Sequence, residues 1–429
     1  MKFIRDFMDK IEPEKKSSPF LHTLWDGIDT FLYAPSHVTK TGTHIKDGMD
    51  LKRTMIMVVL AMQFAFMVGM YNIGHQHYFA QGLFPDFFSG FWEKFVYGIL
   101  QYLPMLIVVH VVGLGIEFIF AAKKGHGIEE GFLVSAFLIP LVMPPAIPLW
   151  IVALATAFSV VIAKEAFGGT GMNIFNIALV ARVFVFFAFP SEISGDEIWV
   201  SPDYSWLHNG FNAVASLFGS ADFFSMNAPA VLVDGYTGAT PLSLAAKGGW
   251  ENVQNYAVTI DTKVYHPYSV SNLILGNVPG SVGEVSKIGV ILGALLLIMT
   301  KIGSWRVMLS IVLGAMFMSI LLNVLNASYA SEVTNAFLSV PWYYQFAMGS
   351  LFFGMAFMAT DPVTAASTNT GKWVYGFMIG VVGIIIRVLN PAYPEGWMLA
   401  ILLLNVFAPL IDHMVLQQNI KRRVSRAKV

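Results

Sequence analysis

Residues 131–150, GFLVSAFLIPLVMPPAIPLW, decide how this chain folds. The apolar run 131–143 is shorter than the roughly 20 residues that a helix needs to cross a bilayer. It ends at Pro144-Pro145, with Pro148 close behind, and proline cannot continue a helix. The stretch therefore predicts a helix that is broken inside the membrane. Such a helix must lie where protein or a cavity satisfies its freed backbone groups.

The composition predicts an integral membrane protein. Of the 429 residues, 56% are hydrophobic and 12% are charged, and the mean hydropathy is +0.63; soluble domains carry about 25% charged residues. The chain has no cysteine, which excludes disulfides, thiolate zinc sites and iron–sulfur clusters held by this chain. Any redox chemistry must therefore use another kind of cofactor.

Hydropathy predicts an all-α polytopic fold with about ten spans. The predicted spans are 54–74, 97–120, 131–143, 148–163, 174–190, 287–302, 307–328, 343–359, 373–389 and 396–415. The eighth span ends in Thr360-Asp361-Pro362 and is the second candidate for a broken helix.

The spans fall into two similar halves, 54–190 and 287–416. Trp150 begins a stretch that reaches Val183-Phe184, and Trp373 begins one that reaches Val406-Phe407 at the same spacing. Proline-containing breaks precede both stretches. Matched, interrupted segments of this kind indicate two inverted five-helix repeats with a translocation site between them.

Charge indicates the orientation. Residues 1–53 are rich in Lys and Arg and contain an amphipathic pattern that predicts a helix on the cytoplasmic membrane surface, and the tail 417–429 is also basic. Lys164 is counted among the cytoplasmic loop charges. The gap 191–286 is acidic. We therefore expect both termini in the cytoplasm and the gap in the periplasm.

Within this gap lies Asp234-Gly-Tyr-Thr-Gly-Ala-Thr240. On the residues alone, Gly, Asp and Thr favour an ordinary turn. The string resembles the D-x-x-(S/T)-G-A-T signature at which flavin transferases attach FMN, through its phosphate, to the final threonine. Further stretches support the resemblance: Pro144–Trp150, Gly168–Asn173, Gly280–Glu284, Met358–Ala365 and Asn390–Gly396.

Over essentially its whole length, the chain resembles the membrane-protein family that includes the B subunits of the Na+-translocating NADH:quinone oxidoreductases and the D subunits of Rnf complexes. The long extension 1–53 favours the first group. The resemblance implies a bacterial inner-membrane redox translocase with covalent FMN on Thr240 and a non-covalent riboflavin. It also implies electron transfer from NADH to ubiquinone or menaquinone, Na+ export, and partner subunits A, C, D, E and F.

Residues near Thr240 are expected to contact the FMN. They are Asp234, Thr237, Gly238 and Ala239, together with Gly280, Ser281 and Glu284 of the glycine-rich loop 276–284. A glycine-rich loop on its own is more often structural, because glycine permits tight turns. The Gly168–Gly171 loop lacks the strand-and-helix context of a dinucleotide site, so nucleotide binding is rejected there.

Ionisable residues at membrane depth are functional candidates by default. Asp361 and Asp412 are candidates for Na+ uptake, with helix capping or loop anchoring as the alternative. Arg182 and Arg387 are interpreted as tethers to backbone carbonyls or to a partner. His110 is interpreted as a hydrogen-bonded core residue, and Glu117 and Glu165 are placed near the interfaces.

A quinone needs an aromatic-lined cleft. The run Phe20, Trp25, Phe31 and Tyr33 and the third span up to Pro145 are candidates, although these aromatic residues are equally typical of a membrane interface. Two alternatives to the redox subunit remain. One is an Rnf-type, ferredoxin-linked relative, and the other is an inverted-repeat transporter or channel without flavin.

Overall fold

The computed structural model describes residues 51–124, 131–193, 198–200, 238–260, 263–328, 335–390 and 396–427, and a few positions before residue 44, namely 10, 13, 22, 25, 27, 29 and 41–43. Within these residues the fold is almost entirely helical. Most of the predicted extension 1–53, and the candidates Phe20, Phe31 and Tyr33 within it, lie outside the described part of the chain.

The first half contains five apolar segments. They are α3 (Leu51–Ala80), α4 (Phe91–Lys124), α5 (Phe132–Val142), α6 (Leu149–Ser159) and α7 (Ile177–Ala188). A π-helix, η1 (Val160–Lys164), and a 3-10 turn, η2 (Glu165–Phe167), continue α6, and a 3-10 turn, η3 (Pro190–Glu192), follows α7. Helix α5 has the short length that its sequence predicts.

The second half begins with α11 (Lys287–Met299) and α12 (Trp305–Ser328). A broken segment follows, made of the 3-10 turn η4 (Ala336–Ser339), α13 (Tyr344–Ala347), α14 (Leu351–Phe353) and a second π-helix, η5 (Gly354–Met358). Helices α15 (Asn369–Leu389) and α16 (Trp397–Ala427) complete it. The predicted span 343–359 is thus several short pieces, because the backbone turns at Met348 and again at Ser350.

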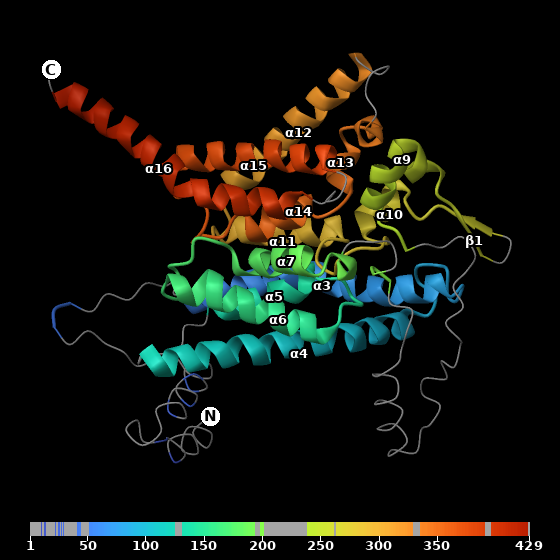
Figure 1. Ribbon diagram of the computed structural model, residues 1–429, viewed down its shortest axis with the longest axis horizontal. Helices are drawn as coiled ribbons and strands as arrows, with labels where there is room; N and C mark the ends of the chain where they lie inside the picture. Colours follow the sequence, from blue (N-terminus) through green and yellow to red (C-terminus); the bar gives the residue numbers. More distant parts are fainter. Residues whose placement is uncertain are drawn as a thin grey trace.

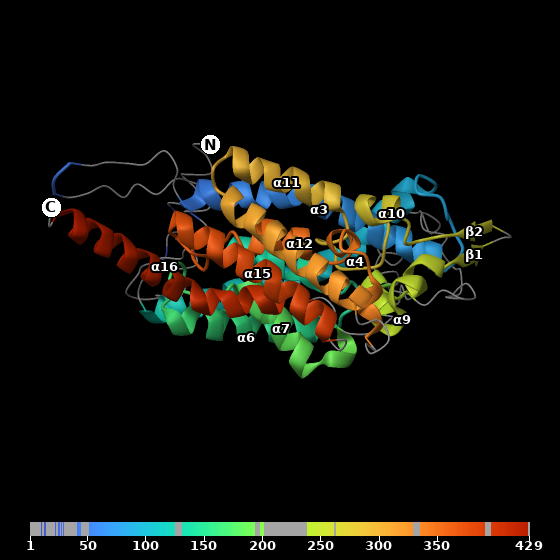
Figure 2. The same cartoon turned by 90° about the horizontal axis from the view of Figure 1, so that it is seen from above.

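Six helices in the described residues are long and apolar enough to span a membrane, and α5, α7 and α11 are shorter apolar helices. Together with the broken segment, they account for the ten predicted spans and confirm an all-α polytopic membrane protein. Figure 1 shows the two halves as stacked layers, with α3–α7 below and α11–α16 above. In Figure 2 the long helices run roughly along the same axis.

The gap between the halves contains more structure than the sequence predicted. Its described residues form α9 (Pro241–Asn255), a hairpin of β1 (Val258–Ile260) and β2 (Lys263–Tyr265), and α10 (Val270–Leu275). These elements gather at one end of the molecule, opposite the C-terminal end of α16 (Figure 1).

Buried arginines satisfy carbonyl groups at the two breaks. Arg182 of α7 donates from Nη1 to the carbonyl of Val142, at the end of α5, over 2.6 Å. Arg387 of α15 donates to the carbonyl of Gln345 in α13 over 2.7 Å. Each guanidinium also lies over a tryptophan ring, Trp199 at 5.4 Å and Trp397 at 5.3 Å. These bonds confirm the interpretation of both arginines as tethers to backbone carbonyls.

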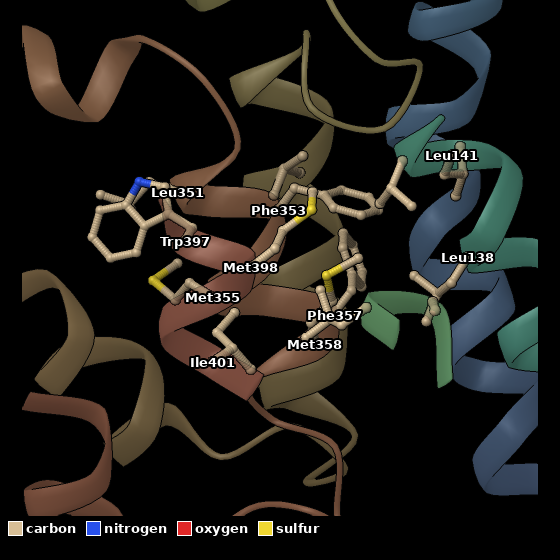
Figure 3. Close-up of a cluster of buried hydrophobic side chains, with 14 of the residues drawn as sticks. Leu138, Leu141, Leu351, Phe353, Met355, Phe357, Met358, Trp397, Met398 and Ile401 are labelled. Carbon is tan, nitrogen blue, oxygen red and sulfur yellow. The ribbon is translucent and has the colours of Figure 1, made fainter. Parts of the chain in front are cut away.

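Apolar side chains fill the space where the broken segments approach each other. Leu138 and Leu141 of α5 face Phe353 and Phe357 of the second half (Figure 3), and the two Phe rings lie 5.2 Å apart. The backbone N–H of Gly283 donates to the carbonyl of Leu141 over 2.9 Å. The glycine-rich loop 276–284 is thereby fastened to the end of α5.

Two ion pairs join α4 to η1 and η2, the segments that continue α6. Lys164 of η1 pairs with Glu117, and Lys124 pairs with Glu165 over 2.9 Å. Lys164 and Glu117 are 3% and 5% exposed. Assigning Lys164 to a loop was therefore wrong, because it lies in a π-helix with its side chain buried against Glu117; its position on the cytoplasmic side stays a prediction. His110 shares a hydrogen bond of 2.8 Å with the carbonyl of Leu106, as predicted, but its side chain is only partly buried and does not belong to the core.

Close packing of α12 on α15 leaves no room for a side chain at Gly380. A Cβ there would lie 2.3 Å from the carbonyl oxygen of Ile311 and 2.5 Å from the nitrogen of Ala315. We expect Gly380→Ala to push the two helices apart and to cost about 1–3 kcal/mol. Gly115→Ala in α4 is the matched control, since nothing lies within 4 Å of that Cβ and alanine favours helix. Thermal unfolding in detergent should show a lower Tm only for Gly380→Ala; equal Tm values would contradict this packing.

The buried pair of Glu117 and Lys164 gives a second prediction. Glu117→Gln leaves the ammonium of Lys164 buried without its partner, which typically costs about 3–5 kcal/mol. Replacing both charges, with Glu117→Gln and Lys164→Met, should recover most of this loss, because no charge then remains buried. The same unfolding assay measures both variants. A single variant as stable as the parent protein would show that the pair is not desolvated.

Candidate functional site

Thr240 is the N-cap of α9. Its Oγ1 accepts a hydrogen bond from the backbone N–H of Ser243 over 3.2 Å, and Pro241 occupies the first helical position. Both features are typical of a helix start, since a threonine cap satisfies a free N–H and proline has no N–H to satisfy. The preceding Gly238 has φ of 63°, a conformation that favours glycine. The hydroxyl of Tyr268 donates to the carbonyl of Ala239 and fixes the loop that precedes the helix.

A small recess opens beside Thr240, and we call it the Thr240 recess. Three parts of the chain line it: the start of α9, the loop between α10 and α11, and the segment before α14. Its lining residues are Thr240, Pro241, Leu242, Leu273, Val278, Pro279, Glu284, Val285, Lys287, Ala347 and Gly349.

The charges around this recess favour an anion. Lys287 donates from Nζ to the carbonyls of Glu284, over 2.6 Å, and of Gly349, over 2.9 Å. The guanidinium of Arg387 lies behind Gly349, where a Cβ would be 2.9 Å from Nη2. Lys287 and Arg387 are 4% and 0% exposed. Two cations and the N-terminus of α9 thus outnumber the single carboxylate of Glu284.

Two of the predicted flavin-site residues line this recess, and four more lie next to those two. Thr240 and Glu284 both line it, and Gly238 and Ala239 directly precede Thr240. The backbone N–H of Ser281 donates to Oε1 of Glu284 over 3.2 Å, and Gly280 lies against the same carboxylate. Asp234 and Thr237 lie outside the described residues.

Sequence reasoning missed Lys287, Gly349 and Tyr268. Lys287 had a signal, because a lysine stands at the first position of an otherwise apolar helix, directly after Ser286, which caps it. Gly349 and Tyr268 gave no signal. Gly349 reaches the recess through the turn before α14, and Tyr268 reaches the carbonyl of Ala239 through the bend before α10.

A larger recess lies between the two halves, toward the end opposite α9, and we call it the Asp361 recess. The starts of α3, α5 and α7, the end of α11 and the segment after η5 line it. Its polar lining residues are Thr54, Ser135, Lys164, Thr170, Asn173, Asn176, Thr360 and Asp361. Both π-helices border it, η1 through Lys164 and η5 through Ala356 and Phe357. Helical segments of this rare type are frequent at functional sites.

Asp361 lies among oxygen-bearing and amide groups. Its Oδ1 accepts from the N–H of Val363 and its Oδ2 from the hydroxyl of Thr364, both over 3.1 Å. The side chain of Asn176, at the start of α7, also hydrogen-bonds to this carboxylate. No group of three His, Cys, Asp or Glu side chains suited to a metal ion occurs in the described residues. A hard ion at Asp361 would therefore use hydroxyl and carbonyl oxygens beside one carboxylate.

Asp412 of α16 anchors the start of α15. Its Oδ1 accepts from the N–H and the hydroxyl of Thr368, over 3.0 and 2.5 Å. Its Oδ2 accepts from the N–H of Ser367 over 2.6 Å. Thr368 is itself the N-cap of α15. These bonds favour the anchoring role for Asp412 that the sequence left open beside Na+ uptake.

Comparison with known proteins gives the family. A family model described as NQR2, RnfD, RnfE family matches residues 38–421. The chain is 42% identical to the B subunit of the Na(+)-translocating NADH-quinone reductase of Ectopseudomonas mendocina (strain ymp), over 99% of each chain. It is 42% identical to the protein of the same name from Azotobacter vinelandii (strain DJ), also over 99% of each chain. The corresponding protein of Chromohalobacter salexigens is 41% identical over 99% of this chain and 96% of its own. The chain therefore belongs to the NQR2, RnfD, RnfE family of membrane proteins.

Proposed function

We propose that this chain is the flavin-bearing membrane subunit of a Na+-translocating NADH:quinone oxidoreductase. FMN is attached through its phosphate to Oγ1 of Thr240, and the subunit passes electrons to ubiquinone or menaquinone while Na+ is exported. The observation that carries the proposal is the position of the Thr240 hydroxyl, at a helix N-terminus in a recess with a buried lysine. The names of the relatives, over nearly the full chain, favour this assignment over the Rnf-type and flavin-free alternatives.

The residues of the Thr240 recess fit a phosphate ester. A phosphoryl group on Oγ1 would stand at the N-terminus of α9, where free backbone N–H groups favour negative charge, although a kink at Gly248 and Gly249 limits the first part of this helix to Pro241–Lys247. Lys287 supplies a cation at the same recess, and Arg387 supplies a second one behind Gly349. The apolar walls of Leu242, Leu273 and Val278 suit the remainder of the cofactor.

When bound, FMN supplies the one-electron and two-electron chemistry that no side chain of this cysteine-free chain provides. The protein residues hold and orient it. Lys287 balances the phosphate charge, Glu284 fixes Ser281 and the loop 276–284, and Tyr268 holds the backbone that presents Thr240.

The Asp361 recess is our candidate for Na+ uptake and for the non-covalent riboflavin. Asp361, Thr360 and Thr364 supply oxygen atoms for the ion. The amides of Asn173 and Asn176 and the walls of Leu138 and Phe357 give the mixture of polar and apolar surface that a flavin requires. We further propose assembly with subunits A, C, D, E and F in the bacterial inner membrane. The end of the molecule with Thr240 then faces the periplasm and both termini face the cytoplasm.

Substitution at Thr240 tests the covalent flavin. In cells that coexpress a flavin transferase, a denaturing gel under ultraviolet light should show a fluorescent subunit band. We expect Thr240→Asn to lose this band, because asparagine lacks the hydroxyl but remains a good N-cap, so α9 keeps its start. Thr259→Val, at an exposed threonine of β1 outside the signature, is the matched control and should keep the band. A band that survives Thr240→Asn would refute attachment at this residue.

Substitution at Asp361 tests Na+ uptake. A carboxylate and a monovalent cation 4 Å apart attract each other by about 4 kcal/mol at an effective dielectric constant of 20. A tenfold change in the dissociation constant corresponds to about 1.4 kcal/mol, so loss of this attraction should weaken Na+ binding by at least that factor. We expect Asp361→Asn to raise the half-saturating Na+ concentration for NADH-driven flavin reduction by at least about tenfold, measured by stopped flow. Asp412→Asn should lower the Tm and leave that concentration unchanged. An unaltered Na+ dependence in Asp361→Asn would remove Asp361 from the Na+ site.

A further inference from the structure

Cations and tryptophans gather on the surface where α11 ends and where α12 and α15 begin, at the end of the bundle that holds the Asp361 recess. We call this group the Trp305 cluster; its members are Lys301, Trp305, Arg306, Lys372 and Trp373. The rings of Trp305 and Trp373 lie 5.8 Å apart and nearly perpendicular to each other. The guanidinium of Arg306 lies 5.1 Å from the centroid of the Trp305 ring. All five residues are exposed or partly exposed, so a molecule outside the bundle can reach them.

The lengths of the helices place this cluster at a boundary of the membrane. Helix α12 has 24 residues and α15 has 21. At a rise of 1.5 Å per residue they are about 36 and 32 Å long, close to the thickness of about 30 Å of the hydrocarbon layer. Because Trp305 and Trp373 are in contact, both helices begin at the same boundary. The cluster therefore lies at the depth of the lipid headgroups, where tryptophan and basic side chains are common.

The backbone holds Lys301 in an unusual conformation. The N–H of Lys301 donates to the carbonyl of Ile298 over 3.0 Å, and the N–H of Ile302 donates to that of Leu297 over 3.1 Å. These two bonds are the Schellman pattern that ends a helix, and glycine is the usual residue at the position of Lys301. Lys301 has φ of 60° there. Residues other than glycine are uncommon in this conformation and are frequent at functional sites.

Arg306 and Lys372 stand at helix ends that disfavour a cation. Arg306 is the second residue of α12 and Lys372 is the fourth of α15, and neither first turn contains an acidic residue. The N-terminus of a helix favours anions and repels cations. Within the part of the chain that the structure describes, no carboxylate forms an ion pair with Lys301, Arg306 or Lys372. Asp412 also lies at the start of α15, but it already accepts three hydrogen bonds from Ser367 and Thr368. An external anion would satisfy the cations and the helix ends together.

An apolar seam leads from the cluster toward the middle of the membrane. On α12, Leu309, Leu313 and Phe317 follow one another at intervals of four residues and are all exposed. Val374 and Phe377 of α15 are also exposed, and the rings of Phe317 and Phe377 lie 5.9 Å apart. Side chains three or four residues apart lie on one face of a helix. A phospholipid would use both the cluster and the seam, whereas a free phosphate ion would use only the cluster.

We infer that the Trp305 cluster binds the phosphate headgroup of an anionic phospholipid, whose acyl chains lie along the seam. The three cations attract the phosphate, and the two tryptophan rings pack against the glycerol backbone. The inference goes beyond the proposed function and does not depend on it, since it requires only that the chain lies in a membrane. It gives the turn between α11 and α12 a specific partner, because a zwitterionic lipid has no net charge for the cluster to attract.

Binding of radiolabelled dioleoyl phosphatidylglycerol to the purified complex in detergent tests the inference. The parent complex should bind it saturably. Each basic residue near an anionic headgroup contributes a factor of about five in affinity. The triple variant Lys301→Gln, Arg306→Gln and Lys372→Gln should therefore weaken this binding by at least about tenfold. The matched control is Lys123→Gln, Lys421→Gln and Arg422→Gln, which removes three exposed cations at the ends of other helices. It should leave this binding unchanged.

Competition identifies the ligand. Unlabelled phosphatidylglycerol should displace the label at least about tenfold better than dioleoyl phosphatidylcholine does, and excess inorganic phosphate should not displace it. Equal competition by the two lipids, displacement by inorganic phosphate, or equal losses in the two triple variants would each overturn the inference. A cluster variant that keeps its lipid binding but loses a partner subunit during purification would assign this surface to a protein contact instead. A thermal unfolding curve like that of the parent shows that the exposed substitutions leave the fold intact.

Discussion

The hydrogen bonds from Arg182 and Arg387 to backbone carbonyls are the interactions on which the rest of this structure depends. A helix that stops inside a membrane leaves carbonyl groups without partners, and water is not available to satisfy them. Each half of this protein solves the problem with a fully buried arginine that reaches back to its own broken segment. A tryptophan ring also lies over each guanidinium, at a distance typical of a cation–π contact. Both arginines therefore serve mainly to satisfy backbone carbonyl groups, and any contact with a ligand is secondary to that role.

The breaks create space at both ends of the bundle. At one end, α5 and the segment before α14 stop short, and the loop 276–284 and the start of α9 fill part of the gap around Thr240. At the other end, η5 and the following turn leave the Asp361 recess between the halves. An apolar layer around Leu141 and Phe353 lies between these two regions (Figure 3). The proposed chemistry thus follows from where the helices end, more than from the residues at their centres.

The sequence predicted the features that depend on local chemistry. Proline after a short apolar run predicted the broken helix α5, and hydropathy predicted ten apolar segments. It could not predict features that depend on distant contacts. The burial of Lys164 requires Glu117 on another helix, and the two π-helices require neighbours that stabilise an irregular helical turn. Lys287 and Gly349 meet beside Thr240 only after the halves pack. The sequence did not predict α9, α10 or the β-hairpin, because the apolar residues of this polar gap show no clear periodicity.

The capping bond of Thr240 has a consequence for how the subunit matures. Oγ1 of Thr240 accepts the N–H of Ser243, so the proposed attachment of FMN and the capping of α9 compete for one oxygen atom. A threonine cap contributes about 1 kcal/mol. A transferase that draws this hydroxyl out of the first turn therefore meets only a small barrier from the helix. Flavin loading at this residue can follow membrane insertion and folding, and it need not precede them.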